Sequence, residues 1–298
     1  MRFSFWISTQ LTWADTLDLA SHAEATGWDG LWVADHFMPN DDNSLDQPMH
    51  EALGLLGGLA AAVPRVRIGS LVLGNTYRHP AVVAKTAATI DHISGGRLVL
   101  GVGAGWQENE HARYGIALGS VKERLDWFEE ACQVLASLRD DARTTVAGAR
   151  YQLDDAPAEP KPSGPMPLLI GASGQKRMAA IVARYADEWN TWSTPSLWTE
   201  KRAGFDRALD EAGRDRADLH RSTQALVFLG SDGRKTAEDF AAIRPAIGGT
   251  SEQLIETIAE WEAAGLDELI VPSFTLGAGQ QAKDSIDQLI EEVAPSFR

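Results

Sequence analysis

Short apolar runs rich in β-forming residues alternate with longer helical patterns along this whole chain. The pattern repeats eight times in 298 residues, always as a short run followed by a helical stretch. Such runs are typical of buried strands, and apolar residues at helical spacing indicate helices that pack on them. The expected strands span residues 2–8, 30–35, 66–74, 97–103, 167–172, 187–192, 221–230 and 268–274. The expected helices span residues 13–27, 51–63, 80–94, 121–139, 175–186, 196–213, 251–265 and 285–297.

A strand followed by a helix, repeated eight times, favours a closed (β/α)₈ TIM barrel over an open doubly wound sheet. We therefore expect an α/β protein with a single domain over residues 1–298. One excursion, residues 140–167, is rich in Pro, Gly and charge and precedes the fifth strand. Loops that precede barrel strands lie on the face that serves stability, so we expect no chemistry there.

The active site should lie where the strands end, because the loops after the strands build the sites of such barrels. The loops after the second, fourth and seventh strands are long and polar. Those after the second and seventh strands could act as mobile lids over a pocket.

The loop after the second strand opens with Asp35 and His36. A histidine and a carboxylate at a strand end can orient a ring, move a proton or bind a metal. An ordinary loop with capping residues fits the spacing equally well. We expect no metal, because His36 lacks an H-x-H or H-E-x-x-H partner and the acidic residues at 41, 42 and 46 lack the spacing of a calcium loop.

The third strand is followed by polar residues just before the proline that starts the next helix, namely Asn75, Tyr77, Arg78 and His79. Arg78 or His79 could bind an anion. A solvated position at the start of the helix is the more common arrangement for such residues.

The fourth strand runs into "GVGAGWQENEHARYG", with glycines at 101, 103 and 105. The dinucleotide fingerprint G-x-G-x-x-G is incomplete in both registers, since Trp106 or Glu108 takes the place of the third glycine. In a barrel these glycines could instead let a flat ring lie close to the backbone, although a glycine-rich packing corner is the alternative. The aromatic and polar residues that follow and could line a pocket are Trp106, Glu110, His111 and Tyr114.

The fifth strand ends in Gly171, Ala172, Ser173 and Gly174, at the start of a predicted helix. Unobstructed N–H groups at a helix N-terminus can bind a phosphate, and Ser173, Lys176 and Arg177 could reinforce such a site. A plain turn with an N-cap is also compatible, and the P-loop pattern is missing. Trp192, at the end of the sixth strand, could stack on a planar cofactor.

The charge balance of the chain limits which partners it could bind. Lys and Arg number 27 against 42 for Asp and Glu, a net charge of -15, which disfavours nucleic acid and anionic membrane surfaces. The single cysteine, Cys132, lies in a predicted helix, so we expect neither an intramolecular disulfide nor a catalytic thiol. With no signal-peptide pattern and no apolar stretch of membrane-spanning length, we expect a cytoplasmic protein in a reducing compartment.

Three segments resemble a known family: residues 27–37 ("GWDGLWVADHF"), 76–115 ("TYRHP" to "HARYG") and 168–190 ("LLIGASGQKR" to "DEWN"). They are similar to the bacterial luciferase-like superfamily of flavin and deazaflavin oxidoreductases, and most of all to its actinobacterial branch that depends on coenzyme F420. The resemblance covers nearly the whole chain.

The resemblance implies that the barrel mouth binds F420 or FMN, with the phosphate at residues 171–174. In F420-using relatives the third strand often carries a cis, non-prolyl bulge behind the ring, which would fall at Leu71 and Val72. Strand ends and resemblance together give the expected cofactor-binding residues: Asp35, Leu71, Val72, Asn75, Gly103, Ala104, Gly105, Trp106, Gly171, Ala172, Ser173, Gly174, Lys176 and Trp192. The similar sugar-phosphate dehydrogenases have a tryptophan and a glutamate where this chain has Asn40 and Trp106, so glucose 6-phosphate is not the expected substrate.

The resemblance further implies hydride transfer between the deazaflavin C5 and a small organic substrate, such as an alcohol or carbonyl, an enone or a nitroaromatic. His36 would handle the accompanying proton, Asp35 would position the ring or the histidine, and Glu110 is the third expected catalytic residue. One alternative is an FMN-dependent monooxygenase fed by a separate flavin reductase, and another is a non-catalytic flavin-binding protein. A homodimer is expected, with an F420-reducing dehydrogenase or a flavin reductase as functional partner.

Overall fold

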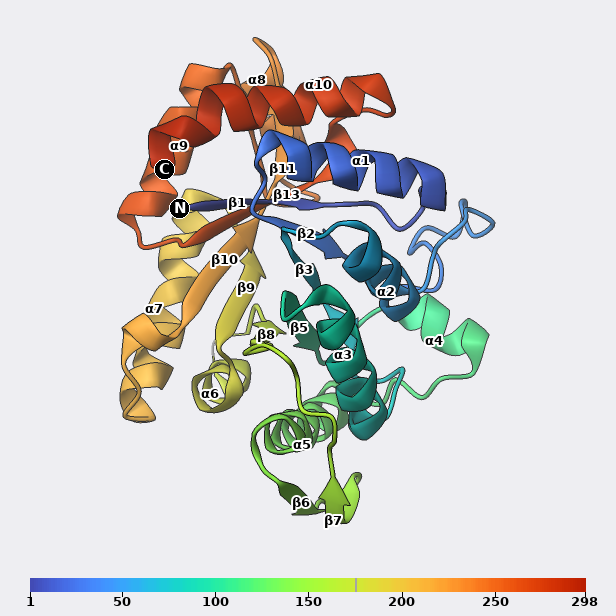
Figure 1. Ribbon diagram of the computed structural model, residues 1–298. Helices are drawn as coiled ribbons and strands as arrows, with labels where there is room; N and C mark the ends of the chain where they lie inside the picture. Colours follow the sequence, from blue (N-terminus) through green and yellow to red (C-terminus); the bar gives the residue numbers. More distant parts are fainter. Residues whose placement is uncertain (175) are drawn as a thin grey trace.

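Eight parallel barrel strands form the centre of the computed structural model, which describes residues 1–174 and 176–298 (Figure 1). The sheet runs in the order β3-β2-β1-β13-β10-β9-β8-β5-β4, and a further pairing of β3 with β5 closes it. The strands are β1 (Arg2–Trp6), β2 (Gly30–Val33), β3 (Arg67–Ser70), β4 (Leu73–Gly74), β5 (Leu98–Gly103), β8 (Leu168–Gly171), β9 (Glu188–Trp192), β10 (His220–Gln224) and β13 (Glu268–Pro272). Because β3 and β4 are two pieces of one strand, the prediction of a (β/α)₈ TIM barrel is confirmed.

Helices surround the barrel, and local sequence signals define their ends. Thr12 caps α1 by accepting from the Asp15 backbone N–H, and Gly27 ends it in the left-handed conformation at φ 98°. Ser120 and Glu123 form a capping box at α5. The surrounding helices are α1 (Trp13–Thr26), α2 (Ala52–Ala62), α3 (Pro80–Ser94), α5 (Val121–Asp140), α6 (Arg177–Tyr185), α7 (Pro195–Glu211), α9 (Ser251–Ala263) and α10 (Gln280–Gln288). Gln175, the expected start of the helix over 175–186, lies outside the described residues.

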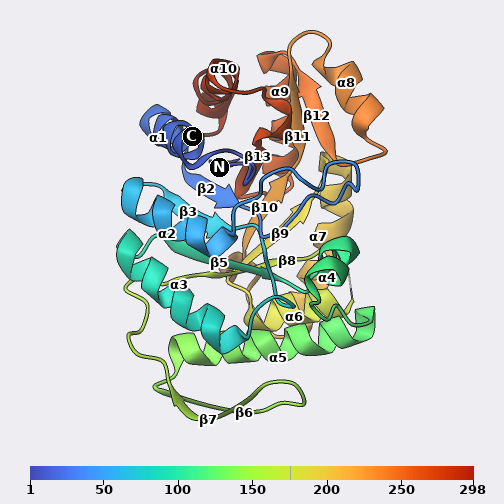
Figure 2. The same ribbon diagram turned by 90° about the vertical axis from the view of Figure 1, so that its right-hand side faces the viewer.

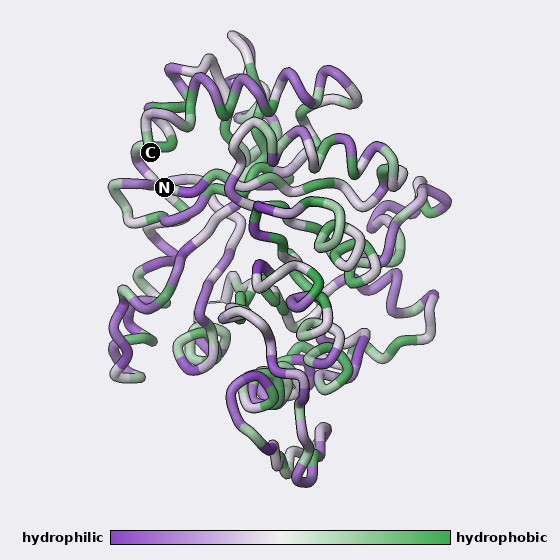
Figure 3. Tube along the Cα trace, in the orientation of Figure 1, coloured by the Kyte–Doolittle hydropathy of each residue, from purple (hydrophilic) through white to green (hydrophobic). Residues whose placement is uncertain are grey.

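The distribution of hydropathy follows the barrel architecture. Hydrophilic residues concentrate in the outer helices and loops (Figure 3). Inside the barrel, Trp6, Trp32, Leu71, Val99, Leu169 and Ile270 form a buried cluster of their own. The remaining short segments are η1 (Arg216–Asp218), η2 (Ser273–Thr275), η3 (Leu289–Val293, a π-helix) and η4 (Ala294–Phe297). In the described ranges, no helix has both the length and the apolar character needed to cross a membrane.

The expected strand over 221–230 is wrong beyond residue 224. The chain leaves the barrel after β10 and forms β11 (Leu226–Leu229), which pairs in parallel with β12 (Ala246–Gly249). Between them lies α8 (Gly233–Phe240), in a stretch expected to be a polar loop. Figure 2 shows these three elements together at one corner of the molecule. The apolar pattern continues through residue 229, so periodicity alone could not show the change of sheet.

The excursion before β8 is a hairpin of β6 (Arg143–Ala147) and β7 (Gln152–Pro157). It lies beside α5, far from the corner that holds α8 (Figures 1 and 2). One of its side chains reaches toward the strand ends, since the Tyr151 hydroxyl accepts a hydrogen bond from the Asn75 amide at 3.5 Å. The long loop after β5 holds a further helix, α4 (Glu108–Tyr114), that the sequence did not predict as a helix.

Candidate functional site

A cavity of about 980 Å³ opens at the carboxyl ends of the barrel strands. Its volume lies at the upper end of the range for small-molecule sites, which is room for a large cofactor together with a small substrate. The predicted residues that line it are Asp35, His36, Leu71, Val72, Gly103, Ala104, Gly105, Trp106, Gly171, Ala172, Ser173 and Trp192. Asn75, Glu110, Gly174 and Lys176, which are also described, are not among the lining residues.

His36 faces the cavity and is held from behind by Glu110 on α4. Its Nδ1 lies 2.8 Å from Oε1 of Glu110, which is fully buried. The other carboxylate oxygen accepts from the Phe37 backbone N–H at 2.8 Å, and the Tyr77 hydroxyl also donates to Glu110. Burial raises the pKa of the Glu110 carboxyl, but its three hydrogen bonds outweigh burial and hold the pKa below its ordinary value.

The protonation of this pair follows from the chemistry of its members. An ionised carboxylate only accepts hydrogen bonds, so Nδ1 of His36 carries the proton that it donates to Glu110. Within the described ranges Nε2 of His36 has no hydrogen-bond partner, which leaves it free for a ligand in the cavity. Burial, followed by the bond to Glu110, raises the pKa of the Tyr77 hydroxyl, so Tyr77 is also a fixed donor.

Asp35 is bound by Arg78. The two guanidinium nitrogens of Arg78 lie 2.7 and 2.8 Å from the two carboxylate oxygens, and the Gly74 backbone N–H donates at 2.9 Å. The Arg78 side chain is only 14% exposed and also pairs with Glu51. The expectation of a solvated Arg78 is therefore wrong, because Arg78 neutralises the buried carboxylate of Asp35. The spacing of residues in the sequence could not show that this carboxylate lies next to Arg78. His79 is exposed and caps α3 by accepting from the Ala81 N–H.

Val72 projects between two strand-end glycines. A Cβ on Gly103 would lie 2.7 Å from Cγ2 of Val72, and one on Gly171 would lie 3.0 Å from both of its methyl groups. The peptide bond between Leu71 and Val72 is cis, as the resemblance implied. The glycines thus make room for the Val72 side chain, and Val72 lines the cavity together with Gly103, Gly105 and Gly171.

The expected phosphate loop lies between β8 and α6. Ser173 lines the cavity, and its hydroxyl lies 3.4 Å from that of Thr191 on β9. No side chain in the described chain caps α6, whose N-cap is Lys176. Arg177 turns away from the loop and pairs with Asp126 and Glu129 of α5 at 2.6 and 3.1 Å. The expectation that Arg177 could reinforce the phosphate site is therefore wrong.

Two further polar residues lie near the site: Lys201, which carried no usable sequence signal, and His111, which the sequence did single out. Lys201, inside α7, donates to the Thr191 hydroxyl at 3.1 Å and to the Trp192 carbonyl at 2.8 Å. Burial lowers the pKa of its ammonium group. His111 was expected to line a pocket, but it is buried, with Nε2 2.7 Å from the Thr76 hydroxyl and Nδ1 2.6 Å from the Gln107 carbonyl.

The family model for luciferase-like monooxygenases matches residues 1–291. The chain belongs to this family. Among curated proteins, the F420-dependent glucose-6-phosphate dehydrogenase of Microbacterium testaceum is 35% identical over 237 residues, 78% of this chain and 69% of that protein. The enzyme of the same description from Nakamurella multipartita is 33% identical over 244 residues, 80% and 71% of the two chains. The prediction of a luciferase-like oxidoreductase is confirmed.

Monooxygenases are also among the relatives of this luciferase-like protein. The pyrimidine monooxygenase RutA of Escherichia coli is 34% identical over 171 residues, 55% of this chain and 47% of that protein. Among solved structures, an F420-dependent secondary alcohol dehydrogenase in complex with an F420-acetone adduct has a TM-score of 0.85 and 24% identity, with 100% of both chains covered. At that identity the likeness shows a shared fold.

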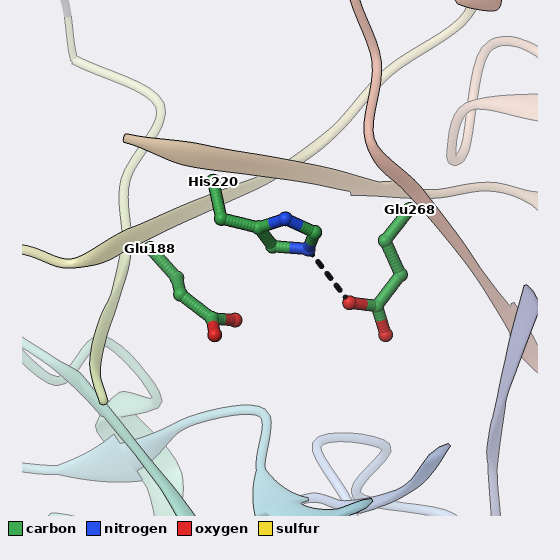
Figure 4. Close-up of side chains that lie close together, drawn as sticks. All are labelled: Glu188, His220 and Glu268. Carbon is green, nitrogen blue, oxygen red and sulfur yellow. Dashed lines mark hydrogen bonds and ion pairs between the residues drawn. The ribbon is translucent and has the colours of Figure 1, made fainter. Parts of the chain in front are cut away.

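A second cluster of titratable groups closes the opposite end of this luciferase-like barrel. Glu188, His220 and Glu268 point toward one another at the starts of β9, β10 and β13, with potential ligand atoms within 4.8 Å (Figure 4). Arg67 of β3 already supplies a cation there, since it pairs with both glutamates and lies 3.0 Å from Glu268. A metal ion would have to displace this guanidinium, so we interpret the cluster as an ion-pair network that joins four strands.

Proposed function

We propose that this luciferase-like protein is an F420-dependent oxidoreductase that transfers hydride between the deazaflavin C5 and a small organic substrate. Alcohols or carbonyls, enones and nitroaromatics are the classes that we would screen. The observation that carries the proposal is His36, which faces a cavity large enough for cofactor and substrate and is held by the buried Glu110. The names of the two relatives matched over two thirds of their length support F420 as the cofactor.

The residues at the cavity fit a large polar ligand. Trp6 Nε1 and Gln224 Oε1 are buried and have no hydrogen-bond partner in residues 1–174 and 176–298, and both side chains line the cavity. A buried polar atom without a partner is costly, so a ligand that bonds to these atoms would remove the cost. Val72 offers an apolar surface for a ring, and Ser173, at the end of the expected phosphate loop, lines the cavity and offers its hydroxyl to an anionic tail.

The chain's own residues have separate roles in this proposal. When bound, the deazaflavin supplies or accepts the hydride. His36 gives or takes the proton of the substrate oxygen at Nε2, while Glu110 keeps Nδ1 protonated and the ring fixed. Asp35 and Arg78 fix the backbone at Gly74, next to the cavity wall.

Parallel titration of the cofactor-free protein with F420 and with FMN, followed by cofactor fluorescence, tests the proposal. We expect F420 to bind at least about 10-fold more tightly, which corresponds to about 1.4 kcal/mol. Tighter binding of FMN would overturn the proposal and support the monooxygenase alternative, for which oxygen consumption with a flavin reductase is the next measurement. F420 binding without turnover of any screened class, and without an effect of His36→Ala, would support the non-catalytic alternative.

A further inference from the structure

Exposed apolar side chains surround the mouth of the cavity. Four large hydrophobic side chains line the cavity and remain exposed: Trp106 at 51%, Val121 at 64%, Ile243 at 71% and Phe274 at 51%. Exposed apolar groups that gather around a concave site mark a surface that becomes covered when a ligand binds. We use this arrangement to infer the class of substrate, an inference that rests on the proposed function.

One corner of the cavity is walled by aromatic rings. Trp6 packs against Trp192 with ring centroids 5.7 Å apart and against Phe274 at 5.1 Å, nearly edge to face. Trp6 and Trp192 are the last residues of β1 and β9, and Phe274 lies in η2, directly after β13. In the barrel, β10 lies between β9 and β13. Flat aromatic or conjugated groups stack well on such a wall, whereas the hydroxyl groups of a polyol would lose hydrogen bonds to water there.

Arg244 stands over this corner. It lies in the loop between α8 and β12, with its guanidinium 4.9 Å from the ring centroid of Trp192. In the part of the chain that the structure describes, the Arg244 side chain has no carboxylate within ion-pair distance and no hydrogen-bond acceptor, although the chain carries a net charge of -15. A stacked guanidinium is held in orientation and presents its N–H fork outward.

The other charged groups of the cavity leave this corner positive. Asp35 is neutralised by Arg78, so it does not balance Arg244. Arg124 lines the cavity from α5, in the first turn of a helix whose Asp126 and Glu129 pair with Arg177 at the start of α6. We assign Arg124 to the anionic tail of the cofactor, because it comes from the side of the expected phosphate loop. Arg244 then remains for a second anion.

We propose that the substrate is a flat organic acid, whose apolar body stacks in the corner of Trp6, Trp192 and Phe274 and whose carboxylate is bound by Arg244. The guanidinium fork matches the two oxygens of a carboxylate, and such charge-assisted pairs are about twice as strong as neutral hydrogen bonds. A sugar phosphate fits this corner less well, because its hydroxyl groups would need hydrogen-bond partners that the faces of the three aromatic rings do not offer.

Calorimetry with the F420-loaded protein tests this inference with two probes of nearly the same shape, trans-cinnamate and methyl cinnamate. We expect the acid to bind at least about 10-fold more tightly than the ester, and Arg244→Gln to abolish that preference. Arg207→Gln is the matched control, since Arg207 is an exposed arginine of α7 outside the cavity lining, and it should keep the preference. Arg244→Lys should keep part of it.

Two comparisons separate the outcomes. The non-planar acid 3-cyclohexylpropanoate should bind more weakly than cinnamate, and glucose 6-phosphate should not compete with it. Equal binding of acid and ester, no binding of either, or an unchanged preference in Arg244→Gln would overturn the inference. Failure of F420 to bind would instead overturn the proposed function, and F420 binding without an acid preference would overturn this inference alone.

Discussion

His36 and Glu110 are 74 positions apart in the sequence, yet Nδ1 of the histidine lies 2.8 Å from the carboxylate of the glutamate. One residue comes from the loop after β2 and the other from α4, after β5. The contact joins two loops of the barrel mouth and fixes the ring that faces the cavity. A His36→Asn variant should therefore bind F420 normally but lose about 100- to 10,000-fold in kcat.

Glu110→Gln tests the positioning of His36 separately. The amide cannot stabilise a charged imidazole and can accept from only one of its two side-chain atoms, so we expect kcat to fall by about 10- to 100-fold. The Kd for F420, measured by fluorescence, should stay unchanged, because Glu110 lies outside the cavity lining. Tyr77→Phe removes one bond to Glu110 and should cost less. An unchanged kcat in Glu110→Gln would contradict the assigned role.

Arg78→Met should destabilise the fold by about 3 kcal/mol, because it leaves the carboxylate of Asp35 buried without its cation. Urea unfolding measures the change. Arg65→Met is the control, since Arg65 is 67% exposed in its pair with Glu24 and an exposed pair contributes about 1 kcal/mol or less. Equal losses in the two variants would show that the Asp35 pair is not buried in solution.

Gly103→Ala should displace Val72 into the cavity, because the new Cβ would lie 2.7 Å from Cγ2 of Val72. We expect weaker F420 binding and a loss of stability of about 1 to 3 kcal/mol. Adding Val72→Ala to this variant should restore part of the F420 affinity and part of the stability. Gly57→Ala is the control, since its Cβ would meet nothing within 4 Å inside α2, and it should stabilise by about 1 kcal/mol. Normal F420 binding by Gly103→Ala would argue against a ring site at Val72.

Glu188 and Glu268, in the ion-pair network at the opposite end of the barrel, should respond oppositely when each is replaced by glutamine. The property compared is the free energy of unfolding. Burial raises the pKa of Glu268, but His220 and Arg67 outweigh it and hold the pKa at about 2, below the ordinary 4.5. A carboxyl whose pKa is depressed by folding stabilises the fold above its unfolded value and loses that contribution as the pH falls through the folded value. Glu268 should thus contribute about 3 kcal/mol at pH 7, lost between pH 4.5 and 2.

Glu188 has the reverse shift, because burial raises its pKa above the ordinary value. Its ionisation therefore disfavours the folded state as the pH rises from its unfolded pKa through its folded one. In urea unfolding at pH 7, Glu268→Gln should be destabilised while Glu188→Gln should be as stable as the parent or more stable. Unfolding of Glu268→Gln should also depend less on pH between 4.5 and 2. Destabilisation of both variants to the same extent would contradict the opposite signs.

The homodimer expected from the sequence stays a prediction. Sedimentation equilibrium should give twice the mass of one chain, and a result of one chain's mass would contradict it. The expected F420-reducing dehydrogenase or flavin reductase likewise stays a prediction, which coupled turnover with either enzyme would check.

The barrel fold and the place of most of the expected site residues could be predicted from the sequence. Strand and helix periodicity is a local property, and in a parallel barrel every strand end reaches the same face, so Asp35, His36, Trp106 and Ser173 were brought together by topology alone. Helix ends such as Gly27 could be predicted as well, because a C-cap depends only on neighbouring backbone.

The pairing of these residues could not be predicted from the sequence, because it depends on how the chain packs. Glu110 binds His36, Arg78 binds Asp35, and Arg177 turns to α5 instead of the phosphate loop. Each pairing joins residues tens of positions apart, and a carboxylate takes whichever cation or donor the packed chain places nearest. Spacing could show that the charges were present, but burial and distance chose the partners. The departure of β11 from the barrel follows the same rule, because a strand's partner is set by the sheet edge it meets.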